Sequence, residues 1–301
     1  MNFINFKYRH KFNVLLFALI TLLGANALKA QFGINLELNR ENYLVHEPVF
    51  AKLSIRNYSG RALVFGEIPE LKGDVSFEIY GPDGEIIRPY NTKLNSMNNI
   101  VLNSGATTDV VVPLSRMYHF SRPGSYTVKA LLSHPQISST YVSKTQSFFI
   151  FNGFCVWERK VGVPDLFNKN AGKQIKTRSV RLLNFYDNKR KLFALCIEDK
   201  KYVYGVVRLA PDIGNKPPQC QIDGLSLVHI LIQISPKVFS YYVYDLNTRL
   251  QEHQYYARSN SINPRIVVDE KQGMVTVAGG RKAIQGQDFV EDDPSPVFKE
   301  K

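Results

Sequence analysis

The chain carries few side chains in the patterns that catalysis or metal binding requires. Its six histidines stand apart, and none forms an i, i+2 or i, i+4 pair suited to a metal. The sequence has no G-x-S-x-G elbow, no H-E-x-x-H motif, no P-loop and no G-x-G-x-x-G. We therefore predict no catalytic residue, no metal site and no cofactor. A glycoside hydrolase can use two carboxylates far apart in sequence, so a glycan-acting enzyme remains an alternative.

His229 raises the question of a reactive site, because it lies inside the dense apolar run "SLVHILIQIS". In a strand over 226–234 it shares a side with Leu227, Leu231 and Gln233, and the next strand brings tyrosines opposite. Buried polar side chains of this kind are normally hydrogen-bonded, here to a backbone or tyrosine oxygen. No nucleophile or second ligand stands at a recognisable spacing. We predict a structural role for His229.

Positive charge is concentrated in one region of the chain. Residues 152–210 hold 13 Lys or Arg against five Asp or Glu, whereas the rest of the chain after residue 30 is about neutral. A partner such as an anionic glycan or a protein of the cell envelope would suit this excess, and the chain has no nucleic-acid recognition motif. The candidate contact residues are Arg178, Arg181, Lys189, Arg190, Lys191, Lys200, Lys201, Tyr242 and Tyr244. The alternatives are a merely solvated basic face and ordinary cross-strand pairing of the tyrosines.

Cysteine usage leaves two possibilities open. Cys155, Cys196 and Cys220 all lie in the second half of the chain, and their spacing matches no metal motif. In an oxidising compartment one disulfide and one free thiol could form. Three buried apolar thiols are the other possibility.

The first thirty residues have the pattern of an export signal. Lys7, Arg9 and Lys11 precede the apolar run "VLLFALITLL", and small residues follow. Cleavage fits after Ala27 or Ala30, and the Ala-Gln junction favours Ala30. An uncleaved anchor is the alternative, although the run is short for a membrane span. We predict an exported protein, periplasmic or extracellular, with residues 1–30 as signal peptide and no stable transmembrane anchor.

Residues 31–151 alternate apolar and polar side chains almost throughout. The alternation is plain at 34–39, 49–56 and 74–79, and "NYSG", "GPDG", "NSG" and "RPG" supply the turns between. About seven short strands at such spacing are typical of a β-sandwich.

The stretch "NLELNRENYLVHEPVFAKLSIRNYSG" resembles the opening of bacterial immunoglobulin-like domains, with its Tyr-x-x-x-Glu-Pro crossover between two strands. "FSRPGSYTVKALL" resembles a late element of the same domains, in which Pro-Gly turns the chain into a strand opening with Tyr126. The resemblance covers about 120 residues and implies an immunoglobulin-like sandwich of the cysteine-free variety. It also implies a structural Tyr126, whose hydroxyl bonds the backbone upstream. It implies no particular function.

Residues 152–284 have a different texture, which begins with Trp157, the only tryptophan. We expect a structural role for Trp157 and strands at 179–186, 191–198, 201–209, 219–223, 226–234, 238–245, 248–257, 264–268 and 273–279. The segment around His229 resembles a β-propeller blade, but a closed propeller needs at least four blades of about 40–45 residues. We therefore predict an antiparallel β domain of blade-like hairpins, without a closed propeller, and a disordered tail at 285–301.

Together these features predict an all-β protein that acts as an exported, non-catalytic binding or structural module. The immunoglobulin-like domain would position a basic, tyrosine-rich β domain. Two alternatives remain. One is a glycan-acting hydrolase with a degenerate propeller-like domain, and the other is an assembly protein that pairs through an edge strand.

Overall fold

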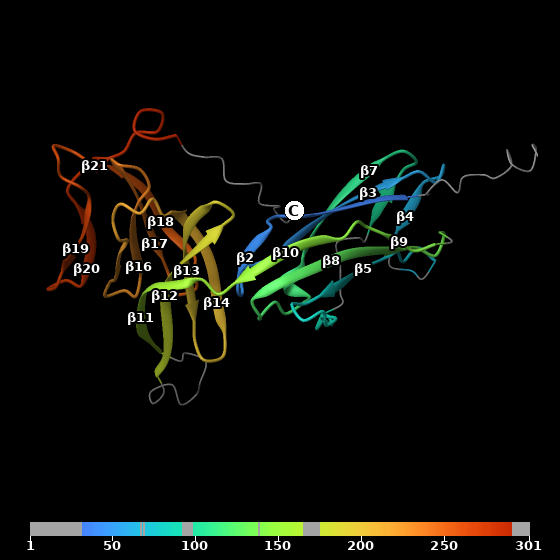
Figure 1. The fold of residues 1–301 in the computed structure, drawn as a ribbon, viewed down its shortest axis with the longest axis horizontal. Coiled ribbons are helices and arrows are strands. Elements are labelled where there is room, and N and C mark those ends of the chain that lie inside the picture. The colour runs from blue at the N-terminus through green and yellow to red at the C-terminus, as the bar shows by residue number, and fades with distance from the viewer. Residues whose placement is uncertain are drawn as a thin grey trace, which may run out of the picture.

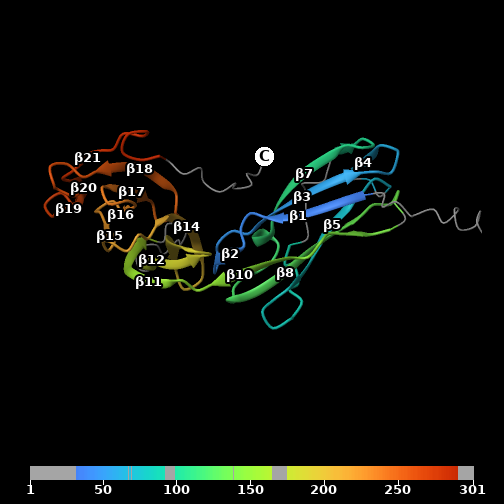
Figure 2. The same cartoon turned by 45° about the horizontal axis from the view of Figure 1, so that its top comes forward.

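The computed structural model describes residues 32–290 apart from 67, 69, 92–98, 138 and 165–174. Regular structure in that part of the chain is almost entirely β-strand, with a short 3-10 helix, η2 (Leu114–Arg116). The predicted all-β class is confirmed. The strands gather into an N-terminal unit and a C-terminal unit that lie side by side (Figures 1 and 2). No helix among the described residues is long and apolar enough to cross a membrane.

The N-terminal unit consists of two sheets and a small ribbon. The first sheet has the order β1-β3-β7, from β1 (Phe32–Leu38), β3 (Phe50–Asn57) and β7 (Thr107–Pro113). The second has the order β2-β10-β8-β5, with β9 beside β8, from β2 (Asn42–Leu44), β10 (Gln146–Phe151), β8 (Gly124–Ser133), β5 (Asp74–Tyr80) and β9 (Tyr141–Val142). The ribbon pairs β4 (Leu63–Phe65) with β6 (Ile100–Leu102). Only β2 and β10, among the described pairs of this unit, run parallel.

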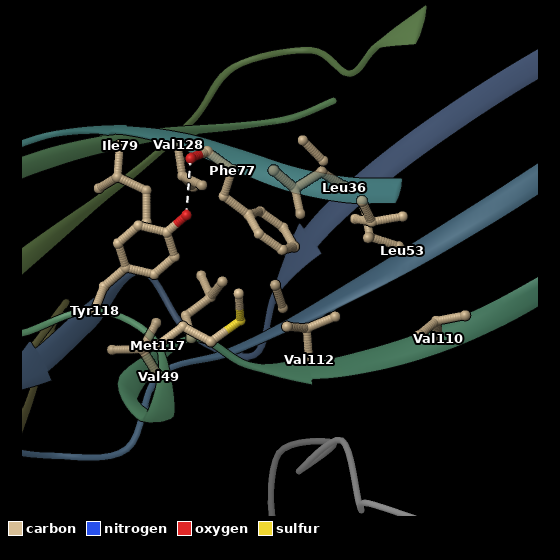
Figure 3. Close-up of a cluster of buried hydrophobic side chains, with 14 of the residues drawn as sticks. Leu36, Val49, Leu53, Phe77, Ile79, Val110, Val112, Met117, Tyr118 and Val128 are labelled. Atoms are coloured by element: carbon tan, nitrogen blue, oxygen red, sulfur yellow. Dashed lines mark hydrogen bonds between the residues drawn. The ribbon is translucent and has the colours of Figure 1, made fainter. Parts of the chain in front are cut away.

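The two sheets of the N-terminal unit enclose one hydrophobic core. Alternate side chains of each strand point inward, as the burial of Val75, Phe77 and Ile79 along β5 shows. Figure 3 shows Phe77 and Ile79 in a cluster with side chains from the facing sheet, and the Tyr118 hydroxyl donates to the carbonyl of Phe77 at 2.9 Å. The alternation read from the sequence therefore corresponds to strands with one buried face.

The C-terminal unit is built from two larger antiparallel sheets. One has the order β11-β12-β13-β14, from β11 (Phe154–Pro164), β12 (Ile175–Asp187), β13 (Arg190–Glu198) and β14 (Val203–Pro211). The other has the order β15-β16-β17-β18-β21, from β15 (Gln219–Ile222), β16 (Val228–Gln233), β17 (Val238–Tyr244), β18 (Leu250–Ala257) and β21 (Arg281–Lys282). We call them the four-stranded and the five-stranded sheet. Their inner faces share a core that includes Leu182, Leu195, Ile230 and Tyr242.

Both sheets of the C-terminal unit are also covered on their outer faces. A hairpin of β19 (Arg265–Asp269) and β20 (Met274–Ala278) packs Ile266 and Val277 against the outer face of the five-stranded sheet. Leu44 of β2 packs on the outer face of the four-stranded sheet. Every residue of β16 and β17 is consequently buried. Strands buried on both faces read as continuous apolar runs, which explains the texture around His229.

The strands expected in the C-terminal unit from 191 onward are all present, with boundaries that differ by one or two residues. β11 was not foreseen, and β12 begins before the expected residue 179. The predicted signal peptide lies outside the described residues, as does the predicted tail from 291 onward. Residues 285–290 carry a turn in which Gly286 N–H donates to Phe289 O at 2.8 Å, and Asp288 pairs with Arg281 at 2.6 Å.

Candidate functional site

The predicted contact residues do not form one surface. Lys189, Arg190 and Lys191 lie where β12 turns into β13, and Lys200 and Lys201 lie where β13 turns into β14. These turns are at opposite ends of the nine residues of β13. At about 3.3 Å per residue, they stand roughly 26 Å apart. A single small ligand cannot reach both groups.

Arg178 and Arg181 are engaged within the protein. Arg178 donates to the carbonyl of Leu246 at 2.7 Å and lies 3.6 Å above the ring of Tyr204. Arg181 forms an ion pair with Glu198 at 2.7 Å. Both guanidinium groups therefore bind within the C-terminal unit, and we do not count either arginine among the residues that contact a partner.

Tyr242 and Tyr244 are buried in the core between the two sheets, so the prediction that they lie on a contact surface is wrong. Their side chains point from β17 toward the four-stranded sheet, on the face opposite to the one that the β19–β20 hairpin covers. His253 stacks on Tyr242 with the ring centroids 4.4 Å apart. Burial raises the pKa of the Tyr244 hydroxyl to about 12, so it stays protonated.

Of the predicted contact residues, the largest group of neighbouring cations lies at the β12–β13 turn. Lys189, Arg190 and Lys191 are consecutive and exposed, and Tyr186, which faces Lys191 across the hairpin, is 62% exposed. Asn188 opens the turn with a φ of 55°, a conformation that asparagine tolerates better than most residues. We call Tyr186–Lys191 the basic turn.

Two carboxylates hold the basic turn in place from the C-terminal unit. The Nζ of Lys191 lies 3.1 Å from Asp212, which also accepts from Asn184 at 2.7 Å. Burial alone would raise the pKa of Asp212, but hydrogen bonds from Gly214, Asn184 and Lys191 outweigh it and hold that pKa below its ordinary value. The second carboxylate, Asp187, accepts from Arg208 of β14.

Arg208 ties the same turn to the N-terminal unit. Its Nε and Nη2 donate to the two carboxylate oxygens of Glu47 at 2.6 and 3.0 Å, and Nη2 also donates to Asn42 O at 2.5 Å. Asn42 in turn donates to the side chain of Asn188 at 2.8 Å. The side chains of Arg208 and Glu47 are only 12% and 7% exposed. Hydrogen bonds and the charge of Glu47 raise the pKa of Arg208 although burial opposes them.

Close packing completes the junction. Leu44 is fully enclosed by side chains of the four-stranded sheet, among them Leu183, Phe185 and Val206. At Gly153, which links the units with a φ of 47°, a Cβ atom would lie 2.9 Å from the Leu44 side chain. The two units are thus held by an apolar contact and a buried ionic network.

Tyr126 and His229 make the hydrogen bonds that were expected of them. The Tyr126 hydroxyl donates to the carbonyl of Arg122, four residues upstream, at 2.7 Å. His229 is 5% exposed, and its two ring nitrogens lie 2.7 Å from the Tyr241 hydroxyl and 3.1 Å from Asp223. The half-buried Trp157 packs at the margin of the core between the sheets. All three side chains contribute to packing or to internal hydrogen bonding.

The three cysteines are free thiols. Cys196 and Cys220 are buried, and Cys155 is exposed, which departs from the alternative of three buried thiols. Cys155 and Cys196 lie on β11 and β13, on either side of β12 and opposite different residues of it, so their backbones are more than about 9–10 Å apart. That separation exceeds the reach of a disulfide. Burial raises the pKa of the Cys220 thiol to about 12.

Two residues of this junction were missed in the sequence, although each leaves a signal there. Glu47 is the acidic residue of the Tyr-x-x-x-Glu-Pro crossover, and Arg208 is the one charged residue in the apolar strand "YVYGVVRLA". A charge within an otherwise apolar strand indicates a buried pair. No protein-family model matches the chain, and no curated protein matches it either. Among the described residues, no group of three or more His, Cys, Asp or Glu could hold a metal ion.

Proposed function

We propose that this protein is an exported, non-catalytic binding module of the cell envelope or exterior, and that the basic turn contacts its partner. The observation that carries the proposal is that the exposed cations of the turn are held by both units. Asp187 and Asn188 are bonded to Arg208 and Asn42, so the backbone beneath Lys189 and Arg190 is fixed before any partner arrives. Fixing a contact surface in advance lowers the entropic cost of binding.

The chemistry of the turn suits an anionic glycan. Asp187 forms an ion pair with Arg208 at the junction, and Lys189 is exposed on the turn. Exposed Tyr186 offers a flat apolar ring beside those cations. A sugar ring that carries carboxylate or sulfate groups can stack on such a ring while its charges meet Lys189 and Arg190. An acidic segment of an envelope protein is the other partner that the experiment below would detect.

Among the described residues, the side chains that most resemble catalytic groups already form hydrogen bonds or ion pairs with other side chains. The Asp223, His229 and Tyr241 chain is buried, with Tyr241 only 4% exposed. Glu47 and Asp187 converge from distant parts of the chain, but Arg208 binds both. These arrangements favour a binding role over the hydrolase alternative.

The test compares two charge reversals of equal size on the same strand. Lys189→Glu with Arg190→Glu should lower the affinity for a polyuronate about tenfold or more, since two opposite charges become like charges. The matched control, Lys200→Glu with Lys201→Glu at the far end of β13, should change it less than about twofold. Titration calorimetry at low and high salt would measure both, with neutral dextran as the uncharged probe.

The result that would overturn the proposal is equal loss in both variants, or binding of neither polyuronate nor a purified acidic peptide by the parent. If polyuronate fails and a purified acidic peptide binds through the same two residues, the partner is a protein. Turnover of a glycan by the parent protein would instead establish the hydrolase.

A further inference from the structure

The four-stranded sheet of the C-terminal unit ends in β11, which is the longest edge strand of that unit. β11 runs from Phe154 to Pro164 and pairs with β12 along one side only. Within this strand, the side chains of Phe154 and Val156 are 74% and 40% exposed. An edge strand of this length presents a row of unpaired backbone donors and acceptors, which natural proteins normally cover or shorten.

The other edge strands of this unit are shorter, and the chain itself contacts parts of them. At β14, the Thr248 hydroxyl donates to the carbonyl of Tyr204 at 3.4 Å. At β15, the side chain of Gln219 accepts a hydrogen bond from the backbone N–H of Ile266 at 2.8 Å, so β19 contacts this strand. β18 is joined by β21 along its last residues. Among the described residues, β11 has no neighbouring strand other than β12.

We propose that β11 is an assembly edge, and that it pairs antiparallel with β11 of a second copy of this chain. In a two-fold pair within one continuous sheet, opposed residues lie on the same face. Trp157 and Val161 pack toward the inner core, so Glu158 and Lys160 lie on the outer face. With Arg159 on the two-fold axis, Glu158 faces the second copy's Lys160, and Trp157 faces its Val161.

This register is self-complementary in charge and in apolar contact. Each Glu158–Lys160 pair occurs twice by symmetry, and so does each Trp157–Val161 pair. The two Arg159 residues face each other at the axis, and each guanidinium donates to Gln221 of its own β15 at 3.3 Å. Regular pairing with β12 resumes at Trp157 after the irregularity between Cys155 and Trp157, so the matched segment is the regular part of β11.

The pairing would join two four-stranded sheets into one of eight strands. Because β11 follows directly on the connection from β10, antiparallel pairing places the two N-terminal units at opposite ends of the joined sheet. The basic turn lies at the β12–β13 connection and stays free in this arrangement. The proposal is therefore independent of the partner proposed for the basic turn.

The experiment measures self-association of the full purified protein by sedimentation equilibrium across a concentration series. The parent should form dimers. Lys160→Glu and Glu158→Lys, taken singly, should each weaken the dimer about tenfold or more, since both symmetric pairs become repulsive. Lys160→Glu is the cleaner variant, because Lys160 faces the neutral Ser179 on β12, whereas Glu158 faces Arg181.

The decisive sample is an equimolar mixture of the two single variants. One copy then carries only lysine and the other only glutamate at these positions, so their heterodimer regains all the opposite-charge pairs. Recovery of dimer in the mixture supports the assigned register, with unchanged thermal unfolding of each variant as the control for folding. A monomeric parent at every concentration would refute the proposal, as would a dimer that both variants leave intact or a mixture that stays monomeric.

Discussion

Replacing Arg208 by methionine tests whether the ionic network at the junction stabilises the protein. The substitution keeps much of the side-chain volume but removes the donors to Glu47, Asp187 and the carbonyl of Asn42. Removing one partner of a buried ion pair costs about 3–5 kcal/mol, because the other charge is left without compensation. We expect the lower end, about 3 kcal/mol. Glu47 keeps the amide of Leu44 at 2.9 Å, and Asp187 is 25% exposed and can be rehydrated.

A double-mutant cycle with Glu47→Gln isolates the pair. Once Arg208 is absent, neutralising Glu47 should restore part of the loss, and the coupling free energy should be about 2 kcal/mol. Urea titration would measure each free energy of unfolding by circular dichroism and by the fluorescence of Trp157, which lies in the C-terminal unit. Arg258→Met, at an exposed arginine, is the matched control and should change stability by less than about 0.5 kcal/mol. A loss below about 1 kcal/mol for Arg208→Met, or strict additivity in the cycle, would refute the reasoning.

Four smaller perturbations test other parts of the fold. Tyr126→Phe removes the bond to the upstream carbonyl and should cost about 1 kcal/mol in thermal or urea unfolding. Tyr241→Phe leaves a ring nitrogen of buried His229 without its partner and should cost more, about 1–3 kcal/mol. The pKa of Asp212 is lower in the folded protein than its unfolded value of about 3.9. Its carboxylate therefore stabilises the fold at pH values above about 3.9, and this stabilisation is lost as the pH falls through the folded pKa. The deficit of Asp212→Asn should therefore be full at pH 7 and shrink in acid, and a pH-independent deficit would contradict this. Alkylation of the native protein should label Cys155 alone, and modification of the two buried thiols before unfolding would contradict their burial.

Local pattern in the sequence predicted the strands well because each strand carries its own signal. Alternation at 74–79 becomes β5, and the apolar runs around His229 become β16 and β17. The error on Tyr242 and Tyr244 arose one level higher. A sheet of a simple sandwich has one face toward solvent, and the tyrosines were assigned to that face. Tyr242 and Tyr244 lie instead on the inner face, in the core shared with the four-stranded sheet, and a contact between segments so far apart in sequence leaves no local pattern.

β11 escaped notice for a related reason. An edge strand with most of its side chains exposed lacks the apolar alternation by which strands are recognised. "VWERKVGV" places charges where a half-buried strand would have apolar residues. Its strand character comes from pairing with β12, which only the folded chain supplies.

The regional excess of positive charge could be interpreted only with the structure, because a count of charges treats arginine and lysine alike. Arg178, Arg181 and Arg208 lie within strands and bind inside the protein through carbonyls, carboxylates and an aromatic ring. Lys189 and Lys200 lie at turns and are exposed. The planar guanidinium suits fixed, multiple hydrogen bonds, whereas the strongly hydrated ammonium favours solvent. A count that gave more weight to turn lysines than to strand arginines would have moved the predicted surface toward the ends of β13, and the basic turn is at one of them.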